Sequence, residues 1–314
     1  MTHVQPASGS SPSIDDQLRQ GAVTVGRPSL LYRLSNLFPY IVLIGYSIVA
    51  IFPIFLIVIN SFKDRRDLFR VPYQPPIWFS LENGVELINN FTLEGYESVF
   101  ARSQLFLYFG NSLFLTVVSL ALITLFGVMV SYALSEYVFP GSRFLYLYLV
   151  LGVMIPIRLG TVSMIELMNT LKIYDTHWAL ITVYVARGLP VALFILIEFM
   201  RQVPRELKEA ARVDGASEYW ILFRLVTPLI RPALATVMVS QLIPIWNDLW
   251  FPLTLAPSES VRTVTLGVST FAGQYKQDWS ALLAALSLAM IPITALYVLF
   301  SRQFIGGLTA GALK

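Results

Sequence analysis

A few polar residues interrupt the long apolar runs of this sequence, and their types are those that bind polar ligands. They are Arg158, Arg187, Trp246, Asn247 and Asp248. A charge inside a membrane helix is costly, so it usually faces a protein interior or an opposite charge. We therefore expect the two arginines to line a polar interior or to pair between helices. The other three surround Pro244 with an aromatic face, an amide and a carboxylate, the groups that recognise a sugar.

Simpler explanations stay open for some of these positions. Glu166, Glu198 and Asp248 could neutralise the two arginines, but the first two lie near the ends of their apolar runs, where water would also accommodate them. Trp250 would equally suit the aromatic belt at a membrane surface.

The sequence contains no group of residues typical of a catalytic or metal site. It has no cysteine, and its two histidines, His3 and His177, are far apart, so thiolate chemistry and a histidine metal site are excluded. The nearest approach to a phosphate-binding loop, Gly306 to Gly311, is followed by Ala312 where that motif requires lysine. We therefore expect a chain that is not an enzyme and that itself binds no cofactor.

Composition places the chain in the membrane class. Of 314 residues, 56% are hydrophobic and 13% are charged, whereas soluble domains contain roughly 25% charged residues. Apolar runs of about 20 residues cross a hydrocarbon core as helices, which predicts an all-α membrane protein with six transmembrane helices. The predicted spans are about residues 37–59, 112–134, 144–168, 178–200, 233–255 and 281–301.

The chain divides into a tail and a membrane domain. Residues 1–35 are mostly polar and predict a disordered tail, and residues 36–314 form the transmembrane domain. An even number of spans puts both termini on one side. The loop lysines and arginines favour the cytoplasm for that side, although the basic cluster 63–70 favours the opposite orientation.

Prolines inside five spans indicate either kinks at a water-lined cavity or ordinary enrichment in membrane helices; they are Pro53, Pro156, Pro190, Pro244 and Pro292.

The loop at residues 201–232 is amphipathic and charged. Pro204 suits the first turn of a helix, and Asp214-Gly215 would end that helix, because glycine adopts the left-handed conformation of a helix terminus. A second helix is expected at about residues 217–225. The segment could lie on the membrane surface as an interfacial helix or contact another protein.

The pattern of this loop resembles the EAA loop of binding-protein-dependent ABC importer permeases. Glu209-Ala210-Ala211 is followed by Gly215 and later by Pro228, while Thr227 departs from the leucine usual in the family. The stretches "NSFKD", "IPIWNDLWFPLTL", "TVTLGVSTFAGQY" and "GLTAGALK" are similar to carbohydrate-uptake permeases of the maltose-transporter second-subunit type. The similarity extends from about residue 37 to the C terminus.

The resemblance implies a transport subunit of the bacterial inner membrane, with both termini cytoplasmic. Its partners would be a second permease subunit, two ATPase subunits that bind ATP and Mg, and an extracytoplasmic sugar-binding protein facing residues 256–279. Coupling to the ATPase would fall to Glu209, Ala210, Ala211, Asp214 and Gly215. Arg212 would form a peripheral ion pair, and "GLTAGALK" would reach towards the ATPase pair.

The sequence does not identify the transported substrate. The stretch "IPIRLGTV" at 155–162 is similar to permeases assigned to disaccharides or amino sugars. A polyol or glycerol phosphate is the alternative within the family. Outside it, the rivals are a secondary transporter driven by an ion gradient and a membrane-embedded enzyme, for which no cluster of catalytic residues is seen.

Overall fold

The computed structural model describes residues 30–80, 86–273 and 278–312. The chain divides into two units, one ending at Ile54 and the other running from Phe55. Helix α2 (Leu30–Asn60) contains the boundary between them. Residues 1–29 of the predicted tail and residues 313–314 lie outside the described residues.

Most described residues of the second unit are helical. They form α3 (Arg65–Arg70), α4 (Glu94–Arg102), α5 (Leu105–Glu136), α6 (Ser142–Leu151), η1 (Gly152–Met154), η2 (Ile157–Gly160), α7 (Thr161–Thr170), α8 (His177–Arg201), α9 (Arg205–Val213), α10 (Glu218–Trp220), the π-helical η3 (Ile221–Val226), α11 (Thr227–Leu229), α12 (Arg231–Trp246), α13 (Trp250–Leu255), η4 (Glu259–Val261), α14 (Val264–Gly273) and α15 (Trp279–Ala312).

A small β-hairpin is present in addition to the helices expected from the sequence. Strands β1 (Ile77–Ser80) and β2 (Glu86–Asn89) pair antiparallel, with Trp78 opposite Ile88. The aromatic and β-branched residues of Ile77–Ser80, followed by Asn83-Gly84 in the sequence, are a recognised hairpin signal. The prediction of six helices did not include this hairpin.

Four described helices are long and apolar enough to cross a membrane: Leu37–Asn60, Leu105–Glu136, His177–Arg201 and Trp279–Val298. Two bent pairs raise the number to six if each is one span. Ser142–Met154 meets Ile157–Thr170 at 86°, and Glu218–Leu229 meets Arg231–Trp246 at 79°. The described residues therefore contain four candidate spans, or six if each bent pair is counted as one span.

Two of the predicted apolar runs are interrupted, one at Pro156 and the other after Trp246. Pro156 lies in the 86° bend between η1 and η2, whereas Pro53, Pro190, Pro244 and Pro292 lie inside continuous helices. The fifth predicted run, 233–255, is interrupted between α12 and α13, where the Asp248 carboxylate accepts a hydrogen bond from the Phe251 amide.

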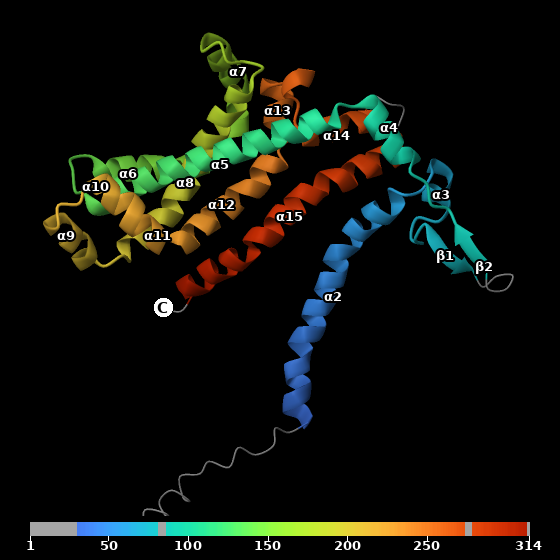
Figure 1. Cartoon of the computed structure of the whole chain (residues 1–314), viewed down its shortest axis with the longest axis horizontal. Helices are drawn as coiled ribbons and strands as arrows, with labels where there is room; N and C mark the ends of the chain where they lie inside the picture. Colours follow the sequence, from blue (N-terminus) through green and yellow to red (C-terminus); the bar gives the residue numbers. More distant parts are fainter. Residues whose placement is uncertain (1–29, 81–85, 274–277, 313–314) are drawn as a thin grey trace, which may run out of the picture. The chain divides into compact units, whose positions relative to one another are not determined.

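Small residues let the span helices of the second unit approach closely, as is common in membrane bundles. Helix α5 packs along α8, and α12 contacts α5, α8 and α15 (Figure 1). A Cβ added to Gly127 of α5 would lie 3.2 Å from the Cβ of Ala192 in α8. Apolar core residues from these helices are buried together, among them Ile123, Tyr184 and Leu196.

Candidate functional site

Helix α9 has the end geometry that the sequence predicts. Asp214 caps its C terminus and Gly215 follows with φ +80°. The Gly215 amide donates to the Arg212 carbonyl at 3.0 Å, and the Ala216 amide donates to the Ala211 carbonyl at 2.9 Å. These two bonds form a Schellman motif, which requires a left-handed residue at the Gly215 position. The turn then leads the chain out of α9.

The segment after the turn differs from the single helix expected at 217–225. Ser217 caps one α-helical turn, accepting from the Trp220 amide, and the π-helical segment Ile221–Val226 follows. The hydroxyl of Thr227 donates to the Leu222 carbonyl at 2.7 Å. Thr227, the residue that departs from the family pattern, therefore forms a hydrogen bond to the π-helical segment. The next residue, Pro228, has no amide hydrogen to donate.

An ion-pair cluster holds α9 against the end of α5. Lys208 pairs with Glu136, and the Arg212 Nη2 lies 2.9 Å from the second Glu136 oxygen. Arg212 also pairs through Nε with Glu218 at 2.7 Å, and the Tyr132 hydroxyl donates to that same Glu218 carboxylate. Two cations thus meet two carboxylates, so the cluster is neutral and its polar groups are mutually satisfied.

Arg212 is consequently engaged within the chain. Hydrogen bonds to Glu218 and Glu136 raise the pKa of its guanidinium above the ordinary range. The sequence suggested Arg212 as a peripheral ion pair with another subunit; here its partners are intramolecular. Glu136, Tyr132 and Glu218 were not singled out, because only the fold brings the end of α5 against α9.

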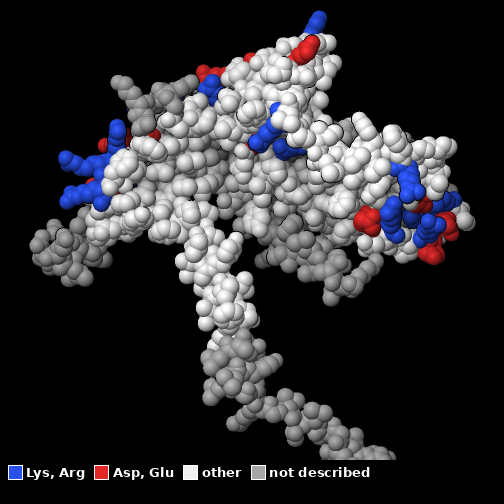
Figure 2. Space-filling model, turned by 180° about the vertical axis from the view of Figure 1, so that it is seen from behind, with Lys and Arg blue, Asp and Glu red and all other residues white. Residues whose placement is uncertain are grey.

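The opposite face of α9 is open. Glu209, Ala210, Asp214 and Gly215 are exposed, while Ala211 turns partly inward against the core. Figure 2 shows charged side chains gathered at its right edge, over the end that carries α9 and α10. Of the five predicted coupling residues, four are therefore accessible to a partner.

A second cluster forms where two interrupted spans meet. The Asp248 side chain is 2% exposed and accepts from the Tyr184 hydroxyl at 3.0 Å and the Phe251 amide at 3.3 Å. Arg158, in η2, lies 3.9 Å from the other Asp248 oxygen. The Trp250 indole donates to the Thr161 hydroxyl at 3.0 Å. These contacts join α13 to the start of α7.

Arg187 lies beside this cluster without an ion pair among the described residues. Its guanidinium carbon is 5.6 Å from the Tyr184 ring centroid and 6.0 Å from that of Phe251, within the range of a cation–π contact. Its Nη2 is buried and has no hydrogen-bond partner within the described part of the chain. Arg158 and Arg187 line one cavity of about 570 Å³ at the Pro156 break.

The remaining predicted residues have different surroundings. Trp246 is buried in a second core, with its ring 6.5 Å from Phe109, so it is a packing residue here. Asn247 is exposed at the end of α12. Glu198 pairs with Arg201 on the surface at 3.0 Å, and Glu166 is exposed. Of the three suggested counter-ions, Asp248 is the one that approaches Arg158 or Arg187 among the described residues.

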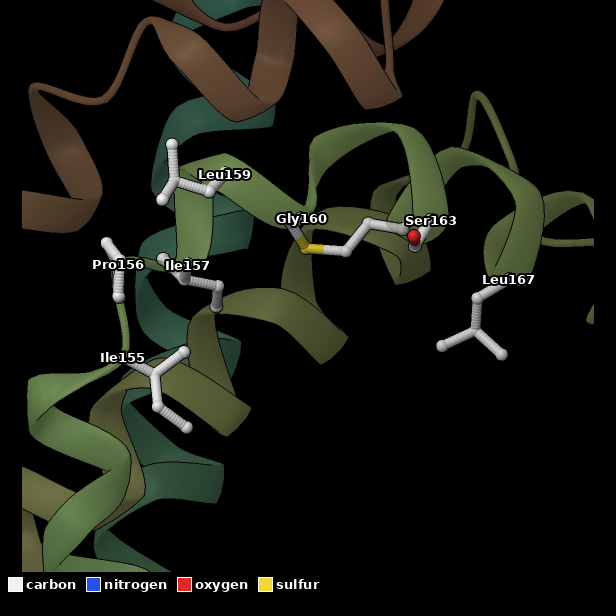
Figure 3. Close-up of a pocket in the computed structure, with 8 residues that line it drawn as sticks. Ile155, Pro156, Ile157, Leu159, Gly160, Ser163 and Leu167 are labelled. Carbon is white, nitrogen blue, oxygen red and sulfur yellow. The ribbon is translucent and has the colours of Figure 1, made fainter.

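An apolar hollow adjoins the arginine cavity. It measures about 490 Å³ and shares Ile155, Pro156, Ile157 and Leu159 with that cavity. Figure 3 shows these residues around the break, with Gly160, Ser163 and Leu167 farther along the chain. The break therefore presents an apolar side and a cationic side.

Comparison with known proteins identifies the family of this chain. The family model described as "Binding-protein-dependent transport system inner membrane component" matches residues 104–306. The chain is 31% identical over 287 residues to the arabinooligosaccharides transport system permease protein AraQ of Halalkalibacterium halodurans, covering 89% of this chain and 98% of that protein. It is 28% identical over 274 residues to the diacetylchitobiose uptake system permease protein NgcG of Streptomyces coelicolor, covering 87% of each.

A solved structure shows the same fold. The crystal structure of a bacterial ABC transporter involved in the import of the acidic polysaccharide alginate aligns with a TM-score of 0.67 at 20% identity, over 88% of this chain and 98% of that chain. The resemblance and the fold class expected from the sequence are both confirmed. The chain belongs to the binding-protein-dependent transport system inner membrane components and is a carbohydrate-uptake ABC transporter permease.

Proposed function

We propose that this permease forms half of the translocation path of an ATP-driven sugar importer and that α9 is the helix on which an ATPase subunit acts. The two faces of α9 carry this proposal. One face is bonded to α5 through Lys208 and Arg212, and the other exposes Glu209 and Ala210. A short helix fixed to a span on one side can pass the rigid-body motion of a docked partner into that span.

Exposed apolar side chains on and after α9 suit a protein partner. Val213 is 87% exposed, and Leu207, Tyr219 and Trp220 are also exposed. Large apolar side chains exposed together with charged ones on one short segment are compatible with a protein interface. The partner cleft would offer an apolar wall and a cation for Glu209 or Asp214. Contact of the same side chains with the membrane surface is the competing explanation.

The proposed assembly contains this chain, a different permease subunit, two ATPase subunits and an extracytoplasmic sugar-binding protein. The binding-protein-dependent description of the family supports the last of these. ATP and Mg would be held by the ATPase subunits, and hydrolysis would occur there. Both termini would lie in the cytoplasm of a bacterium, on the same side of the inner membrane as α9.

The relatives favour a sugar cargo. Their names refer to arabinooligosaccharides, diacetylchitobiose and alginate, which supports a di- or oligosaccharide or an amino sugar. Arg158 and Asp248 would line the path, with Arg187 beside them. Asn247 is exposed nearby in the sequence, and Trp246 would shape the path through packing. A polyol or glycerol phosphate is the alternative cargo.

ATPase activity of the co-purified complex in nanodiscs, with its binding protein and a panel of sugars, tests the proposal. One sugar should stimulate hydrolysis, and Glu209→Lys should abolish that stimulation while the permease still inserts. Glu198→Lys, which changes an exposed carboxylate outside the loop, is the matched control and should retain it. Unchanged stimulation in Glu209→Lys would contradict the role of α9. Failure of any ATPase subunit to co-purify would leave the proposed contact between α9 and an ATPase subunit without support.

A further inference from the structure

The cavity at the Pro156 break has more positive charge than its own residues neutralise. Arg158 and Arg187 both line it, and Asp248 is the carboxylate beside them. That carboxylate is already engaged by the Tyr184 hydroxyl and the Phe251 amide. At 3.9 Å, Arg158 is within ion-pair range of Asp248 but beyond hydrogen-bond distance. The cluster therefore has one uncompensated positive charge and free guanidinium donors.

Arg187 is held so that its donors stay available. The Tyr184 and Phe251 rings lie beside its guanidinium group, and such contacts leave the N–H groups in the plane of the guanidinium free to donate. Its Nη2 is buried without an acceptor among the described residues. A buried donor without an acceptor is unfavourable. An acceptor in the cavity that Arg187 lines would gain this bond once Nη2, which is enclosed in the structure, turns towards it.

The size and lining of the cavity suit a sugar unit with an acidic group. Its volume of about 570 Å³ falls within the usual range for small-molecule sites of roughly 300–1,000 Å³. Ile155, Ile157 and Val191 provide apolar wall beside the two arginines. A guanidinium group binds a planar carboxylate through two parallel hydrogen bonds.

We propose that Arg158 and Arg187 form a subsite for an anionic group, a carboxylate of uronic-acid type, on the sugar that this permease transports. The subsite rests on the proposed function and adds to it the charge of the cargo. The hydroxyl oxygens of a neutral sugar could accept a hydrogen bond from Arg187, but they would leave the excess positive charge uncompensated. The subsite would therefore distinguish acidic from neutral sugars of equal size.

Equilibrium binding to the full-length chain tests this subsite, using neutral-lipid nanodiscs and the subunits that co-purify. The probes are radiolabelled digalacturonate and the equally linked galactose disaccharide, which lacks the carboxylates. Digalacturonate should bind at least roughly tenfold more tightly than its neutral counterpart. Arg158→Gln and Arg187→Gln should each remove that preference. Arg143→Gln, which removes one exposed positive charge elsewhere, should preserve it.

Arg158→Gln keeps the test independent of folding, because that side chain is 64% exposed and its loss opens no core. Equal binding of the two disaccharides, or a preference that survives both substitutions, would overturn the subsite. Complete competition by inorganic phosphate at equal concentration, or loss of the preference in anionic lipid, would assign the cavity to a free anion or a headgroup and overturn it as well. Sugar-stimulated ATPase activity that persists without this preference would leave the proposed function intact.

Discussion

Lys208 of α9 and Glu136 at the end of α5 form an ion pair whose side chains are 6% and 11% exposed. Arg212 reaches the same carboxylate at 2.9 Å. One glutamate on a span helix therefore holds both cations of the inner face of α9. Because neither Lys208 nor Glu136 has much access to water, displacement of α9 away from α5 would separate buried charges, which is strongly unfavourable.

Glu136→Gln should loosen α9 from α5. The substitution removes the charge that Lys208 and Arg212 share, and breaking one side of a buried pair costs about 3–5 kcal/mol. We expect the variant to insert and to retain basal ATPase activity in the complex while sugar uptake falls at least tenfold. Uptake and hydrolysis measured on the same proteoliposomes would show this uncoupling. Glu198→Gln, in the exposed pair with Arg201, should couple normally, and normal coupling in Glu136→Gln would argue against a mechanical role for the pair.

Gly215 should tolerate only residues that adopt a left-handed conformation. Its φ is +80°, and a Cβ built there meets nothing within 4 Å, so the constraint is conformational and not steric. Gly215→Val should therefore cost about 1–2 kcal/mol locally and reduce transport with normal insertion. Gly215→Asn should keep most activity, because asparagine accepts this conformation more readily. Equal uptake by the two variants would show that the turn is not required.

The turn at Gly215 could be predicted from the sequence, whereas the ion pair between Lys208 and Glu136 could not. Asp214-Gly215 is a local signal, so the helix end and its left-handed turn follow from neighbouring residues alone. Glu136 is 72 residues away from Lys208 in the chain, and no local pattern links them. The same limit applies to Tyr184, which reaches Asp248 across a separation of 64 residues.

The predicted spans show a related limit. Hydropathy locates apolar runs but does not say whether a run is one straight helix. A kink at Pro156 was one of two interpretations of the prolines, but neither its angle of 86° nor the end of α12 before Asn247 followed from the sequence. Proline content alone did not identify the break, since Pro53, Pro190, Pro244 and Pro292 lie inside continuous helices. A proline in a span is tolerated where its surroundings satisfy the freed backbone groups, and those surroundings depend on the tertiary fold.

Tyr184→Phe should destabilise the junction of α8 with α13. The substitution keeps the aromatic contact with Phe251, whose ring centroid is 6.2 Å away, but it removes the hydroxyl that donates to Asp248. A buried acceptor that loses its donor costs about 1–3 kcal/mol. Thermal unfolding in nanodiscs should therefore show a lower midpoint. Tyr148→Phe, at an exposed position, is the matched control, and an equal midpoint for both variants would show that Asp248 finds another donor.

Gly95→Ala should separate α4 from α15. A Cβ at Gly95 would lie 2.6 Å from the Ser280 carbonyl oxygen and 2.9 Å from its carbon, and these backbone atoms move only if a helix moves. Alanine is favoured over glycine in a helix by about 0.8–1 kcal/mol, yet overpacking of this kind costs about 1–3 kcal/mol. We expect a net loss of stability, measured by thermal unfolding of the full-length chain. Gly110→Ala, where a Cβ meets nothing within 4 Å, receives the helical benefit alone and should be neutral or stabilised. A stabilised Gly95→Ala variant would mean that α4 and α15 can slide apart without loss, and the contact would then not be a fixed part of the fold.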